Sequence, residues 1–444
     1  MTVHDVIIVG AGASGLATAN RLREADLDVV LLDARDRVGG RVWTEHPAGL
    51  GVPVELGAEF VHGTTPEIDD VTRRAHLRLL DIAGRRWTTR RDKLVLLDSF
   101  WEQLDGVMRR LEEDREPDRS FADALSRMRN VPSLQRKLAV QYVEGFHAAD
   151  TRVISERALA EGGSPRQDVR ERRIGRVVEG YGALIDALAD PVRSLVRPGA
   201  IVRAVRWRPG NVSVEWTDRG GIRTDALEAR AVVITVPLGV LNAPRDVPGH
   251  IDFDPALPDR QRAAELLAMG TVVRVALQFD EPFWTSEKFA RQIGDERFDT
   301  MSFLHAASDV PFSVWWSQYP IRAPLLVGWL GGPGAARMAE WPRDRVIDEA
   351  QKSLASVLSM PRRAIEKRVV AAFTHDWNND PFARGSYSYV TVGGEDAAQK
   401  LARPIRRTVF FAGEHADREG RNGTVHGAIA SGWRVAGELL KMRR

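Results

Sequence analysis

The sequence predicts an α/β protein that begins with a buried strand, a glycine-rich turn and a helix. The apolar run at 6–9 is typical of a parallel strand buried on both faces. A helical pattern over 14–25 follows the turn, and a second apolar run at 29–32 ends in Asp33. The turn has the spacing G-x-G-x-x-G, formed by Gly10, Gly12 and Gly15.

This arrangement is typical of a Rossmann-type dinucleotide site. The first glycine allows a tight turn, the second lets the backbone approach a pyrophosphate, and the third lets the helix pack closely on the strand. The helix N-terminus, at Ala13 and Ser14, faces the phosphates because its free N–H groups favour anions. Asp33 lies where an acid accepts hydrogen bonds from a ribose. The alternative is a glycine turn that holds no ligand.

Composition excludes several classes of protein. The 444 residues are enough for two domains, which could be interleaved. A net charge of only +2 gives no indication of a nucleic-acid partner. The absence of cysteine excludes disulfides, thiolate metal sites, catalytic thiols and a cysteinyl-linked cofactor. With no signal-peptide pattern and no apolar run near the ~20 residues that span a bilayer, we expect a cytoplasmic protein with no membrane partner and no metal.

The segments after the second strand hold further candidates for phosphate and substrate contacts. In R-V-G-G-R at 37–41, paired glycines again let the backbone approach a phosphate, and Arg41 could neutralise its charge. We expect Arg37 to be solvated. The segment 55–63 has small residues around a buried-looking stretch and contains one histidine, His62.

The remaining elements follow from periodicity. Residues 81–190 are mostly helical in pattern. A β-rich section follows, with strands expected at 200–207, 212–217, 231–235, 272–279, 313–318 and 325–330. A helix is expected over 344–358, and the chain ends with a strand at 408–411 and a helix over 424–440.

The strand over 272–279 alternates strictly, and its apolar face consists of Val273, Val275, Leu277 and Phe279. Arg274 lies on the other face. A long cation on so apolar a strand predicts a solvated or cofactor-lined cavity. The alternative is a salt bridge to a nearby carboxylate. Trp315, Trp316 and Trp329 are candidates for lining a pocket, but only one side of a strand can do so and the other must be core.

Taken together, the chain resembles the flavin-dependent amine oxidases, the monoamine and polyamine oxidase group. The motifs that carry the resemblance are G-A-G-A-S-G at 10–15 with Asp33, R-V-G-G-R at 37–41, M-G-T-V-V-R-V-A-L-Q-F-D-E-P-F-W at 269–284, R-G-S-Y-S-Y at 384–389, F-F-A-G-E-H at 410–415 and T-V-H-G-A at 424–428. They follow the order of the family from one end of the chain to the other.

The resemblance implies a Rossmann-type FAD-binding domain made of three discontinuous segments, 1–80, 195–243 and 370–444. An α+β substrate-binding domain, formed by 81–194 and 244–369, is inserted between them. Because the chain has no cysteine, we expect the FAD to be bound non-covalently.

The resemblance also assigns cofactor contacts. It implies that Asp33, where the family usually has glutamate, and Arg35 contact the adenosine half of FAD. It implies that Arg41 lies near the pyrophosphate and that Glu414 binds the ribityl-pyrophosphate region. The amide of Val425 would contact the flavin carbonyl, because a helix N-terminus favours the negative charge of reduced flavin. The complete predicted set is Gly10, Gly12, Ala13, Ser14, Gly15, Asp33, Ala34, Arg35, Gly40, Arg41, Gly57, Ala58, Glu59, Phe60, Val202, Gly413, Glu414, Thr424 and Val425.

Four candidate catalytic residues come from the same resemblance. Tyr387 matches the aromatic residue before the substrate face of the flavin, but the second aromatic wall of monoamine oxidases is replaced by Thr424. Such half-open sites resemble polyamine oxidases and the histone lysine demethylase branch. His62 matches a histidine of several polyamine oxidases, and Trp377 matches a tryptophan close to the flavin. The alternatives are a structural histidine and a plain core aromatic residue.

Arg274, the fifth catalytic candidate, departs from the family. The family usually has lysine there, bridged by water to flavin N5 and implicated in oxygen activation. Lysine can lose its proton in a buried site, whereas arginine effectively cannot. A dehydrogenase that reacts slowly with oxygen is therefore an alternative to an oxidase.

The leading interpretation is FAD-dependent oxidation of an amine, a polyamine or another primary or secondary amine. Hydride transfer to flavin N5 would give an imine, and O2 would reoxidise the flavin to give H2O2. One alternative is a desaturase or dehydrogenase of a non-amine substrate on the same scaffold. Another is a flavin-bearing scaffold or sensor that has lost catalysis. The sequence identifies neither the amine nor the oligomeric state.

We expect the purified protein to be yellow and to hold FAD tightly but non-covalently, because it carries FAD motifs at both ends and no cysteine. Acid precipitation should release all of the flavin, measured by absorbance of the supernatant. Flavin that stays with the pellet would contradict non-covalent binding, and a nicotinamide in its place would contradict the resemblance.

Overall fold

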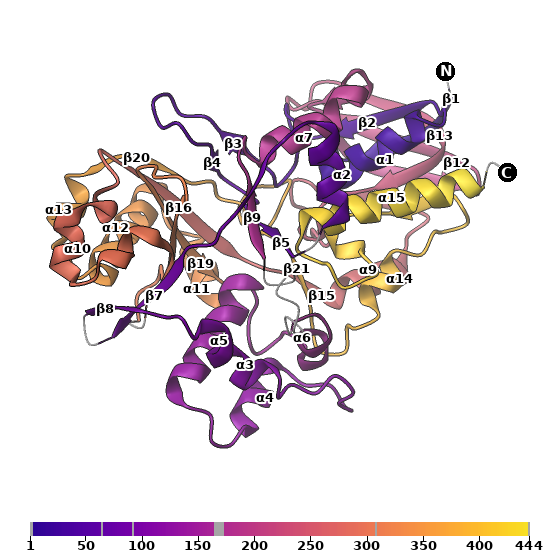
Figure 1. The fold of residues 1–444 in the computed structure, drawn as a ribbon. Helices are drawn as coiled ribbons and strands as arrows, with labels where there is room; N and C mark the ends of the chain where they lie inside the picture. Colours follow the sequence, from indigo (N-terminus) through magenta and orange to yellow (C-terminus); the bar gives the residue numbers. More distant parts are fainter. Residues whose placement is uncertain (1–2, 64, 91–92, 164–172, 307–308, 443–444) are drawn as a thin grey trace.

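The computed structural model describes residues 3–63, 65–90, 93–163, 173–306 and 309–442. Within them, two large sheets form separate halves of the molecule (Figure 1). The sheet that contains β1 is covered by α1 and α15, and the sheet that contains β16 is covered by α12 (Figure 1).

The first sheet carries the predicted strand–turn–helix unit. Among the described residues its strand order is β10-β2-β1-β13-β12-β11-β14, with β22 beside β13. The bounds are β1 (Val3–Val9), β2 (Val29–Asp33), β10 (Val196–Pro198), β11 (Ile201–Arg208), β12 (Asn211–Thr217), β13 (Thr224–Ile234), β14 (Asp252–Asp254) and β22 (Val409–Phe411). The pairs β1–β2, β1–β13, β2–β10 and β13–β22 are parallel.

Alternate residues of the central strands pack into two different cores. Ile8 and Leu31 face a core shared with three helices, α1 (Ala13–Arg23), α7 (Tyr181–Ala189) and α15 (Val425–Lys441). Ile7 and Leu32 face the opposite core, together with residues of β11, β12 and β22. The prediction of strands buried on both faces is confirmed, and the sheet is a rigid base for the turns at its carboxyl edge.

The second sheet has the order β20-β16-β19-β18-β17-β7-β8 among the described residues. The bounds are β7 (Arg85–Arg90), β8 (Lys93–Leu96), β16 (Val272–Phe279), β17 (Met301–His305), β18 (Val314–Ser317), β19 (Leu325–Gly331) and β20 (Val369–Phe373). Val275 and Leu277 pack against α12 (Arg343–Val357) on one face. On the other face, Ala276 packs against the N-terminal hairpin of β3 and β4.

Shorter elements complete the chain. The remaining strands are β3 (Thr44–Glu45), β4 (Val54–Glu55), β5 (Val61–His62), β6 (Leu79–Asp81), β9 (Ile174–Val177), β15 (Leu267–Met269) and β21 (Ser388–Val390). The remaining α-helices are α2 (Pro66–Arg74), α3 (Phe100–Met108), α4 (Phe121–Arg127), α5 (Ser133–Phe146), α6 (Glu156–Gly163), α8 (Leu238–Leu241), α9 (Pro258–Glu265), α10 (Glu287–Ile293), α11 (Pro333–Met338), α13 (Arg362–Glu366) and α14 (Ala397–Leu401). The 3-10 helices are Asp190–Leu195, Phe283–Thr285, Glu296–Thr300 and Glu414–Ala416. The predicted domain boundaries stay a prediction.

The expectation of a mostly helical section over 81–190 is wrong at β7 and β8, near its start, and at β9, shortly before α7. β7 and β8 form a hairpin, and β7 pairs in parallel with β17 of the second sheet. β9 joins β5 and β6 in a small antiparallel sheet. These segments become strands because they pair with strands from distant parts of the chain. Local sequence periodicity contains no information about such pairing.

The expectation of a solvated Arg37 is also wrong. Its Nη1 donates to the carbonyls of Val38 (3.2 Å) and Val42 (3.1 Å), and its Nη2 donates to that of Gly40 (2.9 Å). The guanidinium lies 4.4 Å from the ring centre of Trp43. Burial lowers the pKa of Arg37 to about 10, so it stays charged and holds the double-glycine turn from inside.

Glu55 connects the β3–β4 hairpin to the start of α7. Its Oε2 accepts a hydrogen bond from Thr44 Oγ1 (2.6 Å), and its Oε1 accepts one from the amide of Tyr181 (2.7 Å). The carboxyl is buried, and burial raises its pKa from 4.5 to about 7.

The raised pKa of Glu55 predicts a pH-dependent stability. The folded protein binds this proton more tightly than the unfolded chain, so the contribution is complete below pH 4.5 and is lost as the pH rises through about 7. In the parent protein, ionisation of Glu55 should lower the free energy of unfolding by about 3 kcal/mol between pH 4.5 and about 7. Glu55→Gln should lack this part of the pH dependence. Urea unfolding of both proteins at pH 5 and pH 8 measures it. Parallel pH dependence in the two proteins would contradict the prediction.

Candidate active site

A cavity of about 800 Å³ connects the glycine turn after β1 to the face of the second sheet that carries Trp316 and Trp329. All of the residues predicted for the cofactor and for catalysis line it, with the exception of Gly15. A Cβ at Gly15 would lie 2.0 Å from the carbonyl oxygen of Gly10, so this glycine lets the helix pack on the turn, as predicted. The sequence therefore predicted a set of residues that the fold brings together.

The glycine turn presents features that suit a phosphate. Helix α1 has Gly12 at its N-cap, so no side chain caps it, and its first turn has no acidic residue. The hydroxyl of Ser14 is buried, lines the cavity and has no hydrogen-bond partner in the described structure. A Cβ at Gly12 would meet nothing within 4 Å. Free amides, an unpartnered hydroxyl and open space are what a pyrophosphate needs at a helix N-terminus.

Asp33 and Arg35 lie together where β2 ends. The Asp33 carboxylate accepts hydrogen bonds from the amides of Ala11 (2.7 Å) and Arg35 (2.8 Å), and burial raises its pKa. Arg35 forms an ion pair with Asp380 (2.8 Å). Asp33 thus fastens the glycine turn to the second strand, and each of its oxygens keeps a lone pair that a ribose hydroxyl can use.

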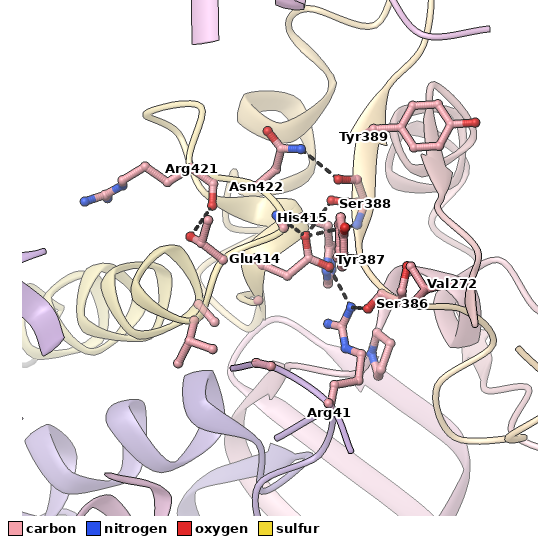
Figure 2. Close-up of a pocket in the computed structure, with 18 of the residues that line it drawn as sticks. Arg41, Val272, Ser386, Tyr387, Ser388, Tyr389, Glu414, His415, Arg421 and Asn422 are labelled. Carbon is pink, nitrogen blue, oxygen red and sulfur yellow. Dashed lines mark hydrogen bonds and ion pairs between the residues drawn. The ribbon is translucent and has the colours of Figure 1, made fainter. Parts of the chain in front are cut away.

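Glu414 connects the N-terminal and C-terminal motifs (Figure 2). Its Oε1 accepts from Arg41 Nη1 at 2.9 Å, and its Oε2 accepts from Ser388 Oγ (2.6 Å) and the amide of Gly423 (2.8 Å). Arg41 Nη1 also donates to the carbonyl of Ser386 (2.8 Å). Burial raises the pKa of Glu414, but the charge of Arg41 and the hydrogen bonds outweigh it and lower the pKa to about 2. Direct contact of Arg41 and Glu414 with a cofactor stays a prediction.

Tyr387 and Trp377 are both held by backbone carbonyls. Tyr387 Oη donates to the carbonyl of Phe146 (2.8 Å), and its ring packs closely over Gly423, where a Cβ would lie 3.0 Å from the ring. Trp377 Nε1 donates to the carbonyl of Leu56 (2.6 Å). Both side chains line the cavity with fixed orientations.

His62 and Thr424 also line the cavity. The structure shows the protonation state of His62 and the hydrogen bond that the hydroxyl of Thr424 makes. The pKa of His62 is lowered to about 4 by burial and by the charges of His426 and Arg86, so the imidazole is neutral at pH 7. The hydroxyl of Thr424 caps α15, accepting from the amide of Gly427 at 3.0 Å. Catalytic roles for both residues stay predictions.

Arg274 belongs to a buried charge cluster centred on Glu59. Arg274 Nη2 lies 2.6 Å from Glu59 Oε2, and Arg176 Nε lies 2.7 Å from Glu59 Oε1. The Trp316 Nε1 donates to Glu59 Oε2 at 3.0 Å. Burial alone would raise the pKa of Glu59, but the two guanidinium groups lower it. Arg274 lines the cavity and also forms a salt bridge, and its position beside the flavin stays a prediction.

The tryptophans divide as the strand geometry requires. Trp315 is fully buried in the core with α12, while Trp316 and Trp329 line the cavity. Sequence reasoning missed Arg86, Arg176 and His305 as residues near the site. The alternation around Trp87 in β7 was the signal for Arg86, but the segment was interpreted as helical.

A cavity that joins a dinucleotide-type turn to a wall of aromatic side chains is typical of an enzyme that binds a dinucleotide cofactor beside its substrate. A family model described as flavin containing amine oxidoreductase matches residues 13–440, and the chain belongs to this family. It is an FAD-dependent enzyme that oxidises an amine, as the sequence predicted.

Relatives and solved structures agree with the family. Polyamine oxidase 2 of Arabidopsis thaliana is 28% identical over 99% of this chain and 88% of its own length. A structure of wild-type putrescine oxidase bound to putrescine has a TM-score of 0.80 at 22% identity, covering 99% of both chains. Cyclohexylamine oxidase from Brevibacterium oxydans IH-35A has a TM-score of 0.79 at 21% identity, covering 100% of both. At this identity the two structures establish the fold.

In the described parts of the chain, no helix combines the length and the apolar composition that crossing a membrane requires.

Asp33→Asn should weaken FAD binding by about 10- to 100-fold, because a charged acceptor for ribose hydroxyls is worth about 1.5–3 kcal/mol. Asparagine keeps an oxygen for one of the two backbone amides, so the glycine turn should persist. Fluorescence titration of the apoprotein with FAD measures the affinity. An unchanged dissociation constant would show that Asp33 serves only the turn.

Proposed function

We propose that the protein oxidises a neutral primary or secondary amine to an imine and uses O2 as the acceptor, forming H2O2. The observation that carries this proposal is the single cavity that joins the predicted FAD contacts to Tyr387, Trp377 and His62. The relatives named polyamine oxidase and putrescine oxidase make a polyamine one candidate substrate. Cytoplasmic location stays a prediction from the sequence.

The predicted FAD contacts span the cavity from Ser14 and Asp33 to the segment 57–60 and Val425. When bound, FAD supplies the two-electron acceptor for the hydride of the substrate C–H bond and passes these electrons to O2. Addition of water to the imine then gives a carbonyl compound, together with ammonia from a primary amine or a smaller amine from a secondary one.

Apolar residues that line the cavity favour the neutral form of the amine over the ammonium form. Phe60, Phe146 and Trp329 line the cavity with apolar surface, which disfavours an ammonium ion. A neutral amine keeps its lone pair, which stabilises the positive charge that develops when hydride leaves. Tyr387, fixed through its hydroxyl, provides a rigid wall that orients the substrate carbon.

Arg274 bears on the choice of electron acceptor. Its side chain holds a positive charge beside the cavity, and Glu59 keeps that guanidinium in place. Positive charge favours the reduction of O2 to anionic species, but arginine cannot release a proton as lysine can. This supports oxidase activity that a lysine would increase.

Anaerobic mixing of the holoenzyme with a panel of amines tests the proposal. We expect at least one amine to bleach the flavin absorbance within the time of turnover, and admission of O2 to restore it with one H2O2 per amine. A protein whose flavin no amine reduces would contradict amine oxidation by this site.

Arg274→Lys should keep the rate of flavin reduction within about tenfold, or 1.4 kcal/mol, and should raise the rate of reoxidation by O2. Arg274→Met should slow reoxidation because it removes the charge. Separate reductive and oxidative half-reactions in a stopped-flow instrument measure both rates. The matched control is Arg176→Met, which removes the other cation from Glu59 at a position that does not line the cavity. Equal reoxidation rates in all four proteins would exclude a role of Arg274 in oxygen chemistry.

A further inference from the structure

Arg86 is a cation in the cavity wall that has no acidic partner within the described parts of the chain. It lies on β7, opposite Phe303 of β17. Its guanidinium carbon lies 4.6 Å from the ring centre of Phe303, 4.9 Å from that of Phe100 and 5.3 Å from that of Trp101. In the part of the chain that the structure describes, no carboxylate and no carbonyl pairs with this side chain.

This environment is unusual for arginine. Burial lowers the pKa of Arg86 to about 10, so the side chain remains charged at neutral pH. Buried charges are normally paired, and contacts with ring faces compensate less for lost hydration than a carboxylate does. Its neighbours thus leave the hydrogen-bonding groups of the guanidinium available toward the cavity.

His305 is a second unpartnered polar group at the same place. Its side chain is 8% exposed, and its ring stacks on Phe100 with centres 4.7 Å apart. Its Nε2 is buried and has no hydrogen-bond partner among the described residues. Burial, together with the nearby charge of Arg86, lowers the pKa of His305 to about 3, so the imidazole is neutral and can present an N–H.

Among the described residues, the carboxylate that lies beside the rings of this part of the cavity already has cationic partners. This carboxylate belongs to Glu59, which is neutralised by Arg176 and Arg274. None of the other described carboxylates that line the cavity pairs with Arg86; these are Asp33, Glu161, Glu395, Glu414, Asp417 and Glu419. The second positive charge of a dicationic polyamine would be repelled by Arg86 and Arg274, which both line the cavity. A negatively charged group would instead be attracted to Arg86.

We propose that Arg86 and His305 form a carboxylate-binding subsite, and that the substrate is an amine that carries a carboxylate separated from the amino group by an apolar spacer. The inference rests on the proposed amine oxidation. The carboxylate binds to the guanidinium and takes no part in the reaction.

The need for a spacer follows from the wall between Arg86 and Tyr387. Three rings follow Phe303 along this wall. Phe60 lies 5.8 Å from Phe303, His62 lies 6.0 Å from Phe60, and Phe146 lies 5.1 Å from His62. The hydroxyl of Tyr387 contacts the backbone of Phe146. An apolar or aromatic spacer between the two charged ends of the substrate matches these rings.

Matched substrate pairs test the subsite in the holoenzyme. The first pair is benzylamine and 4-(aminomethyl)benzoate, and the second is phenethylamine and phenylalanine, whose carboxylate shares a carbon with the amine. We expect kcat/KM for 4-(aminomethyl)benzoate to exceed that for benzylamine by about 10- to 100-fold, mainly through KM, because a charged hydrogen-bonded pair has this strength. Phenylalanine should show no such advantage over phenethylamine.

Variants at position 86 separate recognition from packing. Arg86→Met should abolish the preference for 4-(aminomethyl)benzoate, and Arg86→Lys should restore part of it. The matched control is Arg85→Met, which removes an exposed cation from the same strand outside the cavity and should keep the preference. Binding of benzoate measured by calorimetry should weaken in Arg86→Met by a similar factor, independently of turnover.

The outcomes distinguish the two proposals. If no amine of either pair reduces the flavin while benzoate binding depends on Arg86, amine oxidation fails and the anion subsite stands. If benzylamine and 4-(aminomethyl)benzoate are oxidised equally well, or if the preference survives in Arg86→Met, the subsite is refuted. A larger advantage for phenylalanine would refute the spacer.

Discussion

The structure of the candidate site depends on the buried carboxylate of Glu59. It comes from the N-terminal segment, and its two oxygens are held by Arg274 of β16 and Arg176 of β9. Taking such a carboxylate out of water is unfavourable, and removal of one partner from a buried ion pair typically costs about 3–5 kcal/mol. The cluster therefore keeps three distant segments in one arrangement, and the aromatic half of the cavity lies around it.

Polar contacts between distant parts of the chain also hold the end of the cavity that contains the glycine turn. Asp33 binds the amide of Ala11 across the glycine turn, and Arg41 binds Glu414 from the C-terminal motif. Each contact joins a loop at the carboxyl edge of the parallel sheet to another segment. Such loops carry function because the rigid sheet positions them. The strands supply the scaffold, and the ion pairs determine where the loops meet.

Sequence reasoning succeeded where the chemistry is local. The glycine turn and Asp33 were predictable because backbone conformation and strand ends follow from a few adjacent residues, and strand alternation separated Trp315 from Trp316. Arg176 and Arg86 were missed because their roles come from partners far along the chain. Arg37 was misjudged for a related reason, since its three backbone acceptors exist only after the turn has closed.

The sequence by itself determined the fold class, the glycine turn, the family and most of the predicted site residues that line the cavity. These depend on local backbone chemistry and on motifs that remain in order. Only the tertiary structure decided the charge of the cavity. Arg274 acquires a counter-ion in Glu59, whereas Arg86 meets only aromatic rings among the described residues. The two arginines lie on β16 and β7, which three other strands of the same sheet separate. Their different neighbours make Arg274 ion-paired and leave the guanidinium of Arg86 available toward the cavity.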